Sequence, residues 1–273
     1  GPVIAGITTV SSTSHLVVPT GRTGTRFADE GENIVRNGLV MYLDAKHSYP
    51  SRTGIGTTTS GAAATPGSSL EGEPYIWYDM SGYENNGSFN GKNTTTPQIG
   101  FSTENGGSLL FNGVNSYIDC GNDLSVQLNT GTISVWFRAD SSNTGFNGIV
   151  AKQFAWALFV RNNELIAYDW TANATRDTGI TVGNDTWNHA ALTFSNIVGA
   201  GTSANNAIIY QNGVGILTTT VTLNNHTVSL QIGEANANQY YGGRIAHVCL
   251  YNRALSATEV LQNYNANKSR FGL

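Results

Sequence analysis

Residues 131–138 read GTISVWFR, a short run in which β-branched and aromatic residues predominate. Such residues favour a pleated, half-buried surface. Comparable runs recur along the chain, separated by Gly, Asn and other turn residues, and this spacing predicts a β-sandwich or barrel. The expected strands are 39–44, 108–111, 116–120, 131–138, 148–151, 154–161, 165–170, 188–195, 207–211, 215–223, 228–232 and 243–251.

Two short connections are typical of β-hairpins. Asn212-Gly213 is the clearest two-residue hairpin signal in the chain, because both residues tolerate positive φ. Asn162-Asn163, between Arg161 and Glu164, has the same property. Each pair therefore predicts a tight turn between antiparallel neighbours.

One helix is expected near the end of the chain. Ser256 followed three residues later by Glu259 forms a capping-box pattern, which marks a helix N-terminus. We expect the helix to run to about Asn265, with Leu261 and Tyr264 partly buried. Its place after a long series of strands predicts a structural role.

The composition limits the classes of partner. The chain of 273 residues suits one sandwich domain with an additional arm. Charged residues are only 12%, about half the usual share of roughly 25%. The net charge is −4 and no basic stripe is visible, so we expect no nucleic-acid partner. No apolar run approaches the roughly 20 residues that span a bilayer, so we expect no membrane span.

Six segments occur in the order found in concanavalin A-like, laminin-G-like (pentraxin-like) jelly rolls, which they resemble. They are GLVMYLD (38–44), WYDMSG with NNG (77–87), GGSLLFNG with YI (106–118), TISVWF (132–137), WNH (187–189), and GRIAHV followed by YNRALS (243–256). The resemblance covers residues 38–273. It implies an all-β, two-sheet antiparallel jelly-roll sandwich with an extended N-terminal arm and a short C-terminal helix.

Two segments differ from this body. Residues 1–37 lack sustained periodicity and contain Pro and Gly, which is typical of an arm or connector that docks on a neighbour. Residues 48–74 are rich in Gly, Thr, Ala and Ser, and we interpret them as a flexible insertion within the jelly-roll domain of residues 38–273.

Cys120 and Cys249 are the only cysteines. Both lie in expected strands. Cys120 shares a face with Ile118, whereas Cys249 alternates with apolar neighbours and should point the other way. We therefore favour two free thiols over a disulfide, which suits assembly in a reducing compartment.

No catalytic pattern stands out. The family that the chain resembles includes β-glucanases, which carry paired carboxylates on one strand in an E-x-D-x-x-E pattern. Retaining hydrolysis needs such a pair of carboxylates. Glu71 and Glu73 have the right parity but lie in the insertion, and Glu164 and Asp169 have opposite parity. We therefore expect no enzyme activity.

The resemblance also implies a possible cation, because such jelly rolls often hold one Ca²⁺ through carboxylate and carbonyl oxygens. Asp44 and Asp79 are the candidate ligands, followed by Asp119 and Asp123. The alternative for Asp79 is that it caps the turn into Ser81-Gly82.

Two clusters have the composition of a glycan site, in which aromatic rings cover the apolar face of a sugar and amides or carboxylates bind its hydroxyls. The candidate residues are Asn236, Asn238, Gln239, Tyr240 and Tyr241 in one cluster, and Tyr168, Asp169 and Trp170 in the other. The alternative is that Trp170 and Tyr241 belong to the core or its rim.

The end of the chain carries a narrower resemblance. Residues 251–256 with 260–271 resemble laminin-G-like modules of bacteriophage tail-fibre and other virion proteins, and residues 6–21 are similar to connectors in such proteins. The leading hypothesis is a non-catalytic virion structural or adhesion protein, tail-fibre or capsid-associated. It would be oligomeric in the assembly, contact other virion proteins through residues 1–37 and present a surface for host glycans.

Two alternatives stay open. The chain could be a secreted or cell-surface bacterial lectin-like module that binds polysaccharide with calcium. It could also be a divergent enzyme of the glucanase fold.

Overall fold

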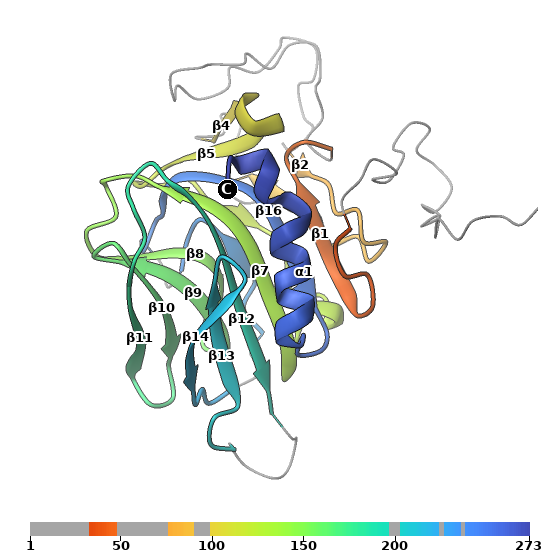
Figure 1. Cartoon of the computed structure of the whole chain (residues 1–273), viewed down its shortest axis with the longest axis vertical. Coiled ribbons are helices and arrows are strands. Elements are labelled where there is room, and N and C mark those ends of the chain that lie inside the picture. Colours follow the sequence, from red (N-terminus) through yellow and green to blue (C-terminus); the bar gives the residue numbers. More distant parts are fainter. Residues whose placement is uncertain (1–32, 48–75, 90–98, 197–202, 224–226, 236–237) are drawn as a thin grey trace, which may run out of the picture.

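The computed structural model describes residues 33–47, 76–89, 99–196, 203–223, 227–235 and 238–273. These residues form two eight-stranded antiparallel sheets that pack face to face, so the predicted all-β sandwich is confirmed (Figure 1). The larger part of the arm, residues 1–32, and the insertion at 48–74 lie outside the described residues.

Sheet A is built around a long pair of central strands. Its order is β14 (Val214–Thr219), β13 (Ala207–Gln211), β12 (Trp187–Ser195), β7 (Thr130–Ala139), β16 (Gly242–Tyr251), β5 (Ser108–Asn112) and β4 (Gly100–Ser102). β7 and β16 are each ten residues long. One edge of β16 pairs with β7, and the other is shared by β5 and by β1 (Leu39–Asp44).

Sheet B contains the shorter strands. Its order is β11 (Ala174–Thr181), β10 (Glu164–Asp169), β9 (Trp156–Arg161), β8 (Phe146–Lys152), β15 (Leu230–Ile232), β6 (Ile118–Asp119), β3 (Gly87–Phe89) and β2 (Ile76–Trp77). β11 was missed in the sequence because most of its residues are exposed or half-buried and show no apolar alternation. Three-residue 3-10 turns lie at Glu104–Gly106 (η1) and Leu124–Val126 (η2).

The main core lies between the two sheets. Side chains from alternate positions of each strand meet there, among them Val135 and Phe137 of β7 and Leu158 and Val160 of β9. Residues at the intervening positions face outward, away from this core. Each sheet therefore has an outer face whose residues can be read from strand parity.

The predicted hairpins are confirmed. Asn212 and Gly213 connect β13 to β14 with φ of 49° and 80°, and Asn162 and Asn163 connect β9 to β10 with φ of 49° and 64°. Positive φ at both central residues is the backbone of a two-residue hairpin turn whose twist matches that of the strands.

The helix α1 (Ala257–Asn267) lies across the outer face of sheet A, near β7, β16 and β1 (Figure 1). Its capping box is present, with the backbone N–H of Glu259 donating to Ser256 Oγ at 3.3 Å. The expected partial burial of Leu261 is wrong, because 41% of this residue is exposed while Val260 is buried. The turn η3 (Lys268–Phe271) continues the helix.

The described end of the predicted arm packs on the domain. Ile34 and Val35 are buried in the cluster beneath α1, and the backbone N–H of Val35 donates to Asn263 Oδ1 at 2.8 Å. The Tyr251 hydroxyl donates to the carbonyl of Val35 at 3.0 Å. The packed body thus includes residues 33–37, which the sequence had assigned to the arm.

Both cysteines are free and buried, as expected. Cys120 belongs to the core between the sheets, whereas Cys249 belongs to the cluster on the outer face of sheet A. The predicted difference in face is therefore confirmed. Burial raises the pKa of the Cys120 thiol well above its usual value.

Candidate functional site

The outer face of sheet B carries several partly exposed aromatic side chains together with two carboxylates. Strand register defines this face, because Gln231 of β15 pairs with Ala151 of β8 and with Asp119 of β6. Their neighbours Ile118 and Ile232 point into the core. Two groups of residues, described next, occupy this face.

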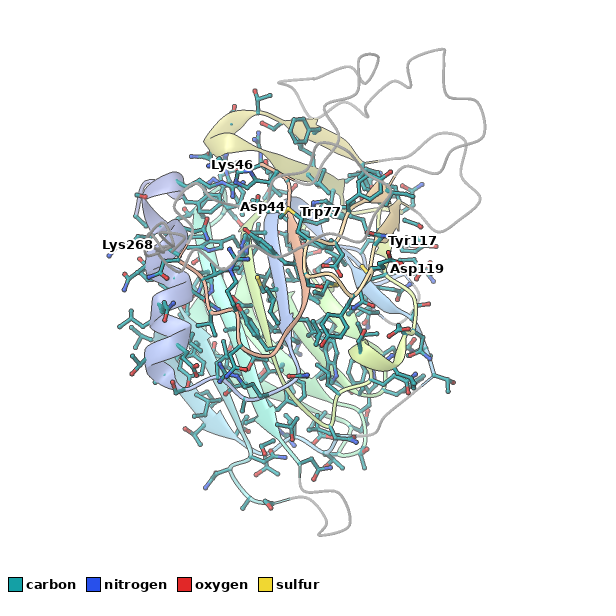
Figure 2. All side chains as sticks on the ribbon, turned by 90° about the vertical axis from the view of Figure 1, so that its right-hand side faces the viewer. Asp44, Lys46, Trp77, Tyr117, Asp119 and Lys268 are labelled. Carbon is teal, nitrogen blue, oxygen red and sulfur yellow. The ribbon has the colours of Figure 1, made fainter. Side chains whose placement is uncertain are left out.

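The first group, here called the tyrosine–carboxylate cluster, consists of Tyr117, Asp119, Gln231, Glu234 and Tyr240. The rings of Tyr117 and Tyr240 are partly exposed, and their centroids lie 6.4 Å apart with planes inclined by 36°. Figure 2 shows Tyr117 and Asp119 near each other at one side of the molecule. Two aromatic rings and two carboxylates therefore share one small area.

Glu234 organises the cluster from below. Only 4% of this residue is exposed. Its Oε2 accepts a hydrogen bond from Gln231 Nε2 at 3.2 Å, and its Oε1 accepts one from the backbone N–H of Asn238 at 3.1 Å. The Tyr240 side chain also hydrogen-bonds to Glu234. One buried carboxylate thus fixes an amide, a ring and the segment between them.

The segment that carries Tyr240 is tied to β8. The backbone N–H of Gly148 donates to the carbonyl of Gln239 at 3.0 Å, and Asn147 Nδ2 donates to the carbonyl of Tyr240 at 2.6 Å. A Cβ at position 148 would lie 2.6 Å from Ala235, so the close approach requires a glycine there. These contacts with β8 thereby fix the position of Tyr240 relative to sheet B.

The carboxylates affect both phenols. Burial, with added repulsion from Glu234 and Asp119, raises the pKa of Tyr117. Burial, the negative charge of Glu234 and the Glu234 hydrogen bond likewise raise the pKa of Tyr240. Both hydroxyls therefore stay protonated and can donate hydrogen bonds at neutral pH.

The second group, here called the aromatic strip, consists of Phe146, Phe154, Phe159, Tyr168 and Trp170. The rings meet edge to face, with centroids 5.7 Å apart for Phe146–Tyr168 and 5.3 Å apart for Tyr168–Trp170. Phe159 is fully buried beneath the others, and 38% of Phe154 is exposed. The strip begins at Phe146, next to the Asn147 that holds Tyr240, so the two groups adjoin.

A family model for the concanavalin A-like lectin/glucanase superfamily matches residues 112–261, more than half of the chain. The chain belongs to this superfamily. The matched span contains both groups on the outer face of sheet B. The search of curated proteins found no match.

Solved structures share the superfamily fold at low identity. Domain 4 of AbnA, a GH43 extracellular arabinanase from Geobacillus stearothermophilus, in complex with arabinotriose, is 17% identical with a TM-score of 0.53, over 83% of this chain and 98% of that one. The binding domain of Paraclostridial Mosquitocidal Protein 1 is 17% identical with a TM-score of 0.57, over 85% and 52%. The receptor-binding domain of botulinum neurotoxin type G is 15% identical with a TM-score of 0.51, over 84% and 51%. The chain thus spans nearly all of the first and about half of the others.

The structure brings only some residues of the first predicted glycan cluster, 236–241, together on this face. Tyr240 lies in the tyrosine–carboxylate cluster, the side chain of Asn238 is exposed, and Gln239 is half-buried beside it. Tyr241 is fully buried and packs against Phe111 and Phe137, so its ring has no face to offer a sugar. Asn236 lies outside the described residues.

The second predicted cluster divides by strand parity. Tyr168 and Trp170 belong to the aromatic strip on the outer face. Asp169 points the other way and is 1% exposed, with Oδ2 accepting hydrogen bonds from Arg176 Nη2 at 2.8 Å and from the backbone N–H of Thr222 at 2.9 Å. This ion pair joins β10 and β11 to the segment after β14, which makes Asp169 a structural residue.

The first two candidate calcium ligands, Asp79 and Asp44, accept hydrogen bonds from other groups of the protein. Asp79 accepts hydrogen bonds from the backbone N–H groups of Tyr42, Ser81 and Asn85 and from the Ser81 hydroxyl, and burial is the main cause of its raised pKa. Asp44 is paired with Arg270, whose Nη1 lies 2.9 Å and 3.1 Å from the two carboxylate oxygens. In this arrangement the oxygens of both aspartates already accept hydrogen bonds from protein donors.

The weaker candidates also have protein donors. Asp119 accepts from the backbone N–H of Gly121 at 2.7 Å, and Asp123 caps η2 by accepting from Ser125. Asp44 lies apart from Asp119 in Figure 2. Within the described ranges, no group of three or more His, Cys, Asp or Glu side chains could hold a metal ion.

Sequence reasoning missed Tyr117, Gln231 and Glu234 as site residues. A signal for two of them was present, because Tyr117 and Gln231 alternate with core residues and must face outward. Glu234 follows a strand end after Gly233, and nothing in its local pattern indicates burial. Its position depends on contacts with residues of the 238–240 segment.

The histidines at 47, 189 and 247, which the structure describes, do not form a group with other side chains that could hold a metal ion. His189 is fully buried, and its Nε2 lies 2.9 Å from Ser134 Oγ. Burial and the neighbouring His247 lower the pKa of His189 to about 3, so it is neutral at physiological pH. None of the described helices is long and apolar enough to cross a membrane.

Proposed function

We propose that the chain is a non-catalytic carbohydrate-binding domain that binds glycans at the tyrosine–carboxylate cluster on the outer face of sheet B. The observation that carries this proposal is the pair of partly exposed rings, Tyr117 and Tyr240, beside the oriented polar groups of Glu234 and Gln231.

The chemistry suits a saccharide. A tyrosine ring covers the C–H face of a pyranose, while its hydroxyl, the Asp119 carboxylate and the Gln231 amide exchange hydrogen bonds with sugar hydroxyls. Tyr240 is pre-positioned by Glu234 and Asn147, so its binding to a sugar loses little side-chain entropy. The aromatic strip adjoins the cluster and extends the apolar surface for further sugar units.

Fold relatives give supporting context. One is described in complex with arabinotriose, one as the binding domain of a mosquitocidal protein and one as the receptor-binding domain of a neurotoxin. Identities of 15–17% support the shared fold alone. The assignment to carbohydrate therefore depends on the side chains of this chain.

The absence of catalysis is part of the proposal. Both oxygens of Glu234 accept hydrogen bonds from protein donors, so the group is held as a scaffold rather than poised to transfer a proton. Asp169 is paired with Arg176 and points away from Glu164, so these carboxylates do not form a hydrolytic pair.

Binding to a glycan panel tests the proposal. The purified domain should bind at least one immobilised oligosaccharide, and Tyr240→Ala and Tyr117→Ala should each weaken that binding by about 10- to 100-fold, as loss of an aromatic anchor does. Tyr83→Ala is the matched control, because Tyr83 is 52% exposed but lies outside the cluster. Equal losses in all three variants would contradict the site.

The same panel tests the absence of catalysis. Incubation of the domain with the glycans that it binds should release no reducing sugar above the buffer rate. A release that Glu234→Gln abolishes would show an enzyme and overturn this part of the proposal.

We further propose that the domain works as an adhesion or structural component of a bacteriophage virion. Support comes from the sequence of residues 251–271, which resembles virion modules, and from two buried free thiols. Mass spectrometry of purified particles should detect the chain. Its recovery from the soluble fraction alone, or the discovery of a secretion signal in its gene, would favour the secreted or cell-surface lectin-like alternative.

A further inference from the structure

The aromatic strip continues the outer face of sheet B away from the tyrosine–carboxylate cluster. Phe146 is the first residue of β8, next to the Asn147 that bonds to the carbonyl of Tyr240. From there the rings follow one another at centroid distances of 5.7 Å to Tyr168, 5.3 Å on to Trp170 and 6.3 Å on to Phe154. Phe154 lies in the turn that follows β8, so the strip runs from the cluster towards the opposite end of this strand.

The far end of the strip has an unusual backbone. Phe154 has a φ of 67°, in the left-handed region that bulky side chains rarely adopt. It is 38% exposed, and its ring meets Trp170 at an interplanar angle of 64°. Residues held in such conformations cluster at ligand-binding sites, where the surrounding structure keeps them in place. This end of the strip therefore has a feature of a binding surface as well as of a packed one.

Polar groups accompany the rings along the strip. The Tyr168 hydroxyl donates to Asn173 Oδ1 at 2.8 Å, at an exposed position. The guanidinium of Arg161 lies 4.8 Å from the centroid of the Phe146 ring, and 38% of this side chain is exposed. Hydroxyl, amide and guanidinium groups can exchange hydrogen bonds with sugar hydroxyls, while the rings contact C–H faces. The strip thus offers the same two kinds of contact as the cluster.

From this succession we infer that the domain binds a linear polysaccharide along several consecutive sugar units, which extend from the tyrosine–carboxylate cluster to Trp170 and Phe154. The inference rests on the proposed function, since it names the class of glycan for the same face. A chain that continues beyond the cluster gains a ring contact as further units reach the strip. A disaccharide, or a single terminal sugar of a branched glycan, contacts the cluster alone.

Affinity should therefore increase with chain length. An aromatic contact of this kind contributes up to about tenfold in affinity. The test measures dissociation constants by calorimetry for linear cello-, malto-, xylo- and arabino-oligosaccharides, each from the disaccharide to the hexasaccharide. In a series that binds, the hexasaccharide should bind about 10- to 100-fold more tightly than the disaccharide.

Tryptophan fluorescence gives a direct readout of the strip. The structure describes all five tryptophans, and four of them are buried: Trp77, Trp136, Trp156 and Trp187. Trp170 is partly exposed, so a ligand on the surface changes the environment of this ring above all. Binding of the hexasaccharide should shift the emission to shorter wavelength, because the ring loses contact with water. The disaccharide should leave the emission unchanged, and Trp170→Phe should abolish the shift.

A substitution at each end of the face separates the strip from the cluster. Trp170→Ala should weaken hexasaccharide binding by about tenfold and leave disaccharide binding within about twofold of wild type. Tyr240→Ala should weaken the binding of every length. Val214→Ala is the matched control, because Val214 is 62% exposed on β14 of sheet A and should leave all affinities unchanged. Should Trp170→Ala fail to fold, Trp170→Phe retains a ring at this position, and its smaller loss should again be confined to the longer chains.

The outcomes distinguish the two proposals. If no oligosaccharide of any length binds, the proposed function fails and this inference with it. If oligosaccharides bind but the disaccharide and the hexasaccharide have equal affinities, the inference alone is overturned. It is also overturned if substitution of Trp170 weakens short and long chains equally, or if the longest chain that binds leaves the tryptophan emission unchanged.

Discussion

The outer faces of the two sheets differ in how far they are covered by other elements. On sheet A, α1 and η3 cover the face, and aromatic residues such as Trp136, Tyr251 and Phe271 are buried there. On sheet B, no helix among the described residues lies over the face, and Tyr117, Tyr168, Trp170 and Tyr240 stay partly exposed. Aromatic residues therefore stabilise one face and remain available on the other.

The covered face includes polar groups that need partners. Ser134 pairs with His189, and Asn263 bonds to the Tyr251 hydroxyl and to the backbone of Val35. These contacts come from five separate parts of the chain. Buried hydrogen-bonded groups favour one arrangement of a covering element, because a shift that breaks these bonds leaves donors unsatisfied.

A matched pair of tryptophan variants should show the largest difference between the faces. Trp136 stacks on Phe271 with centroids 4.4 Å apart and is fully buried, so Trp136→Ala should cost about 3–5 kcal/mol of unfolding free energy. Trp170 is partly exposed, so Trp170→Ala should cost about 1 kcal/mol. Urea denaturation measures both.

Similar costs for the two variants would contradict the comparison, since they would mean that the aromatic strip is as important for stability as the covered face. Should Trp136→Ala fail to fold, Trp136→Phe preserves part of the stack and still permits the measurement.

An ion pair gives a second comparison. Asp44 has no exposed surface and holds Arg270 of η3, so Asp44→Ala leaves a buried guanidinium and should cost about 3 kcal/mol. The lower end of the usual range applies because Arg270 keeps the carbonyls of Asn105 and Gly107 as acceptors. Thermal or urea unfolding measures the loss.

The control for this ion pair is Asp185, which lies 3.3 Å from Arg138 and is 72% exposed. Asp185→Ala should cost less than about 1 kcal/mol, because exposed pairs are screened by water and salt. Equal losses at the two positions would show that η3 is held by its aromatic contacts rather than by Asp44.

Much of the fold could be predicted because it is encoded locally. Alternation in β7 and β16, the pairs Asn162-Asn163 and Asn212-Gly213, and the Ser256 capping box each require only neighbouring residues. The exception is β11, whose exposed edge position puts little constraint on its side chains. Burial of Val35 was also missed, because it depends on α1, which is more than two hundred residues away.

The candidate site was predicted only in part for the same reason. Composition identified Tyr240, Tyr168 and Trp170, and the face of each follows from the strands around it. Tyr241 and Asp169 belong to the same two predicted clusters, but their side chains point into the molecule. Strand parity at these two positions, and not residue type, decides that orientation. The burial of Glu234 arises from contacts across a turn, which composition does not reveal.

Acid should weaken the attachment of α1 in a defined range. Hydrogen bonds from Arg253 and from the Ser256 backbone lower the pKa of Glu259 from 4.5 to about 2. A carboxyl whose pKa is depressed in the folded state stabilises the fold above its unfolded pKa, and this contribution is lost as pH falls from 4.5 towards 2. Unfolding free energy measured across this window should show the loss.

Glu259→Gln is the matched variant, because Gln also forms a capping box but cannot ionise. The difference in stability between wild type and variant should be greatest at neutral pH and should shrink between pH 4.5 and 2. A constant difference across that range would show that the Glu259 charge does not contribute.

The smallest expected effect concerns the open face alone. Burial is the main cause of the raised pKa of Tyr117, and repulsion by Glu234 and Asp119 adds to it. Asp119→Asn removes one of these charges and should lower the pKa of Tyr117 towards 10, while Tyr240 responds mainly to Glu234 and should change less. Titration of the two ring signals by NMR measures both pKa values in one sample.

The same variant should leave stability unchanged. Because the aromatic stack on sheet A is untouched, the unfolding free energy of Asp119→Asn at pH 7 should stay within about 0.5 kcal/mol of wild type. An unchanged Tyr117 pKa would place Asp119 outside the cluster, whereas a large loss of stability would mean that the outer face of sheet B is as integral to the fold as the covered one.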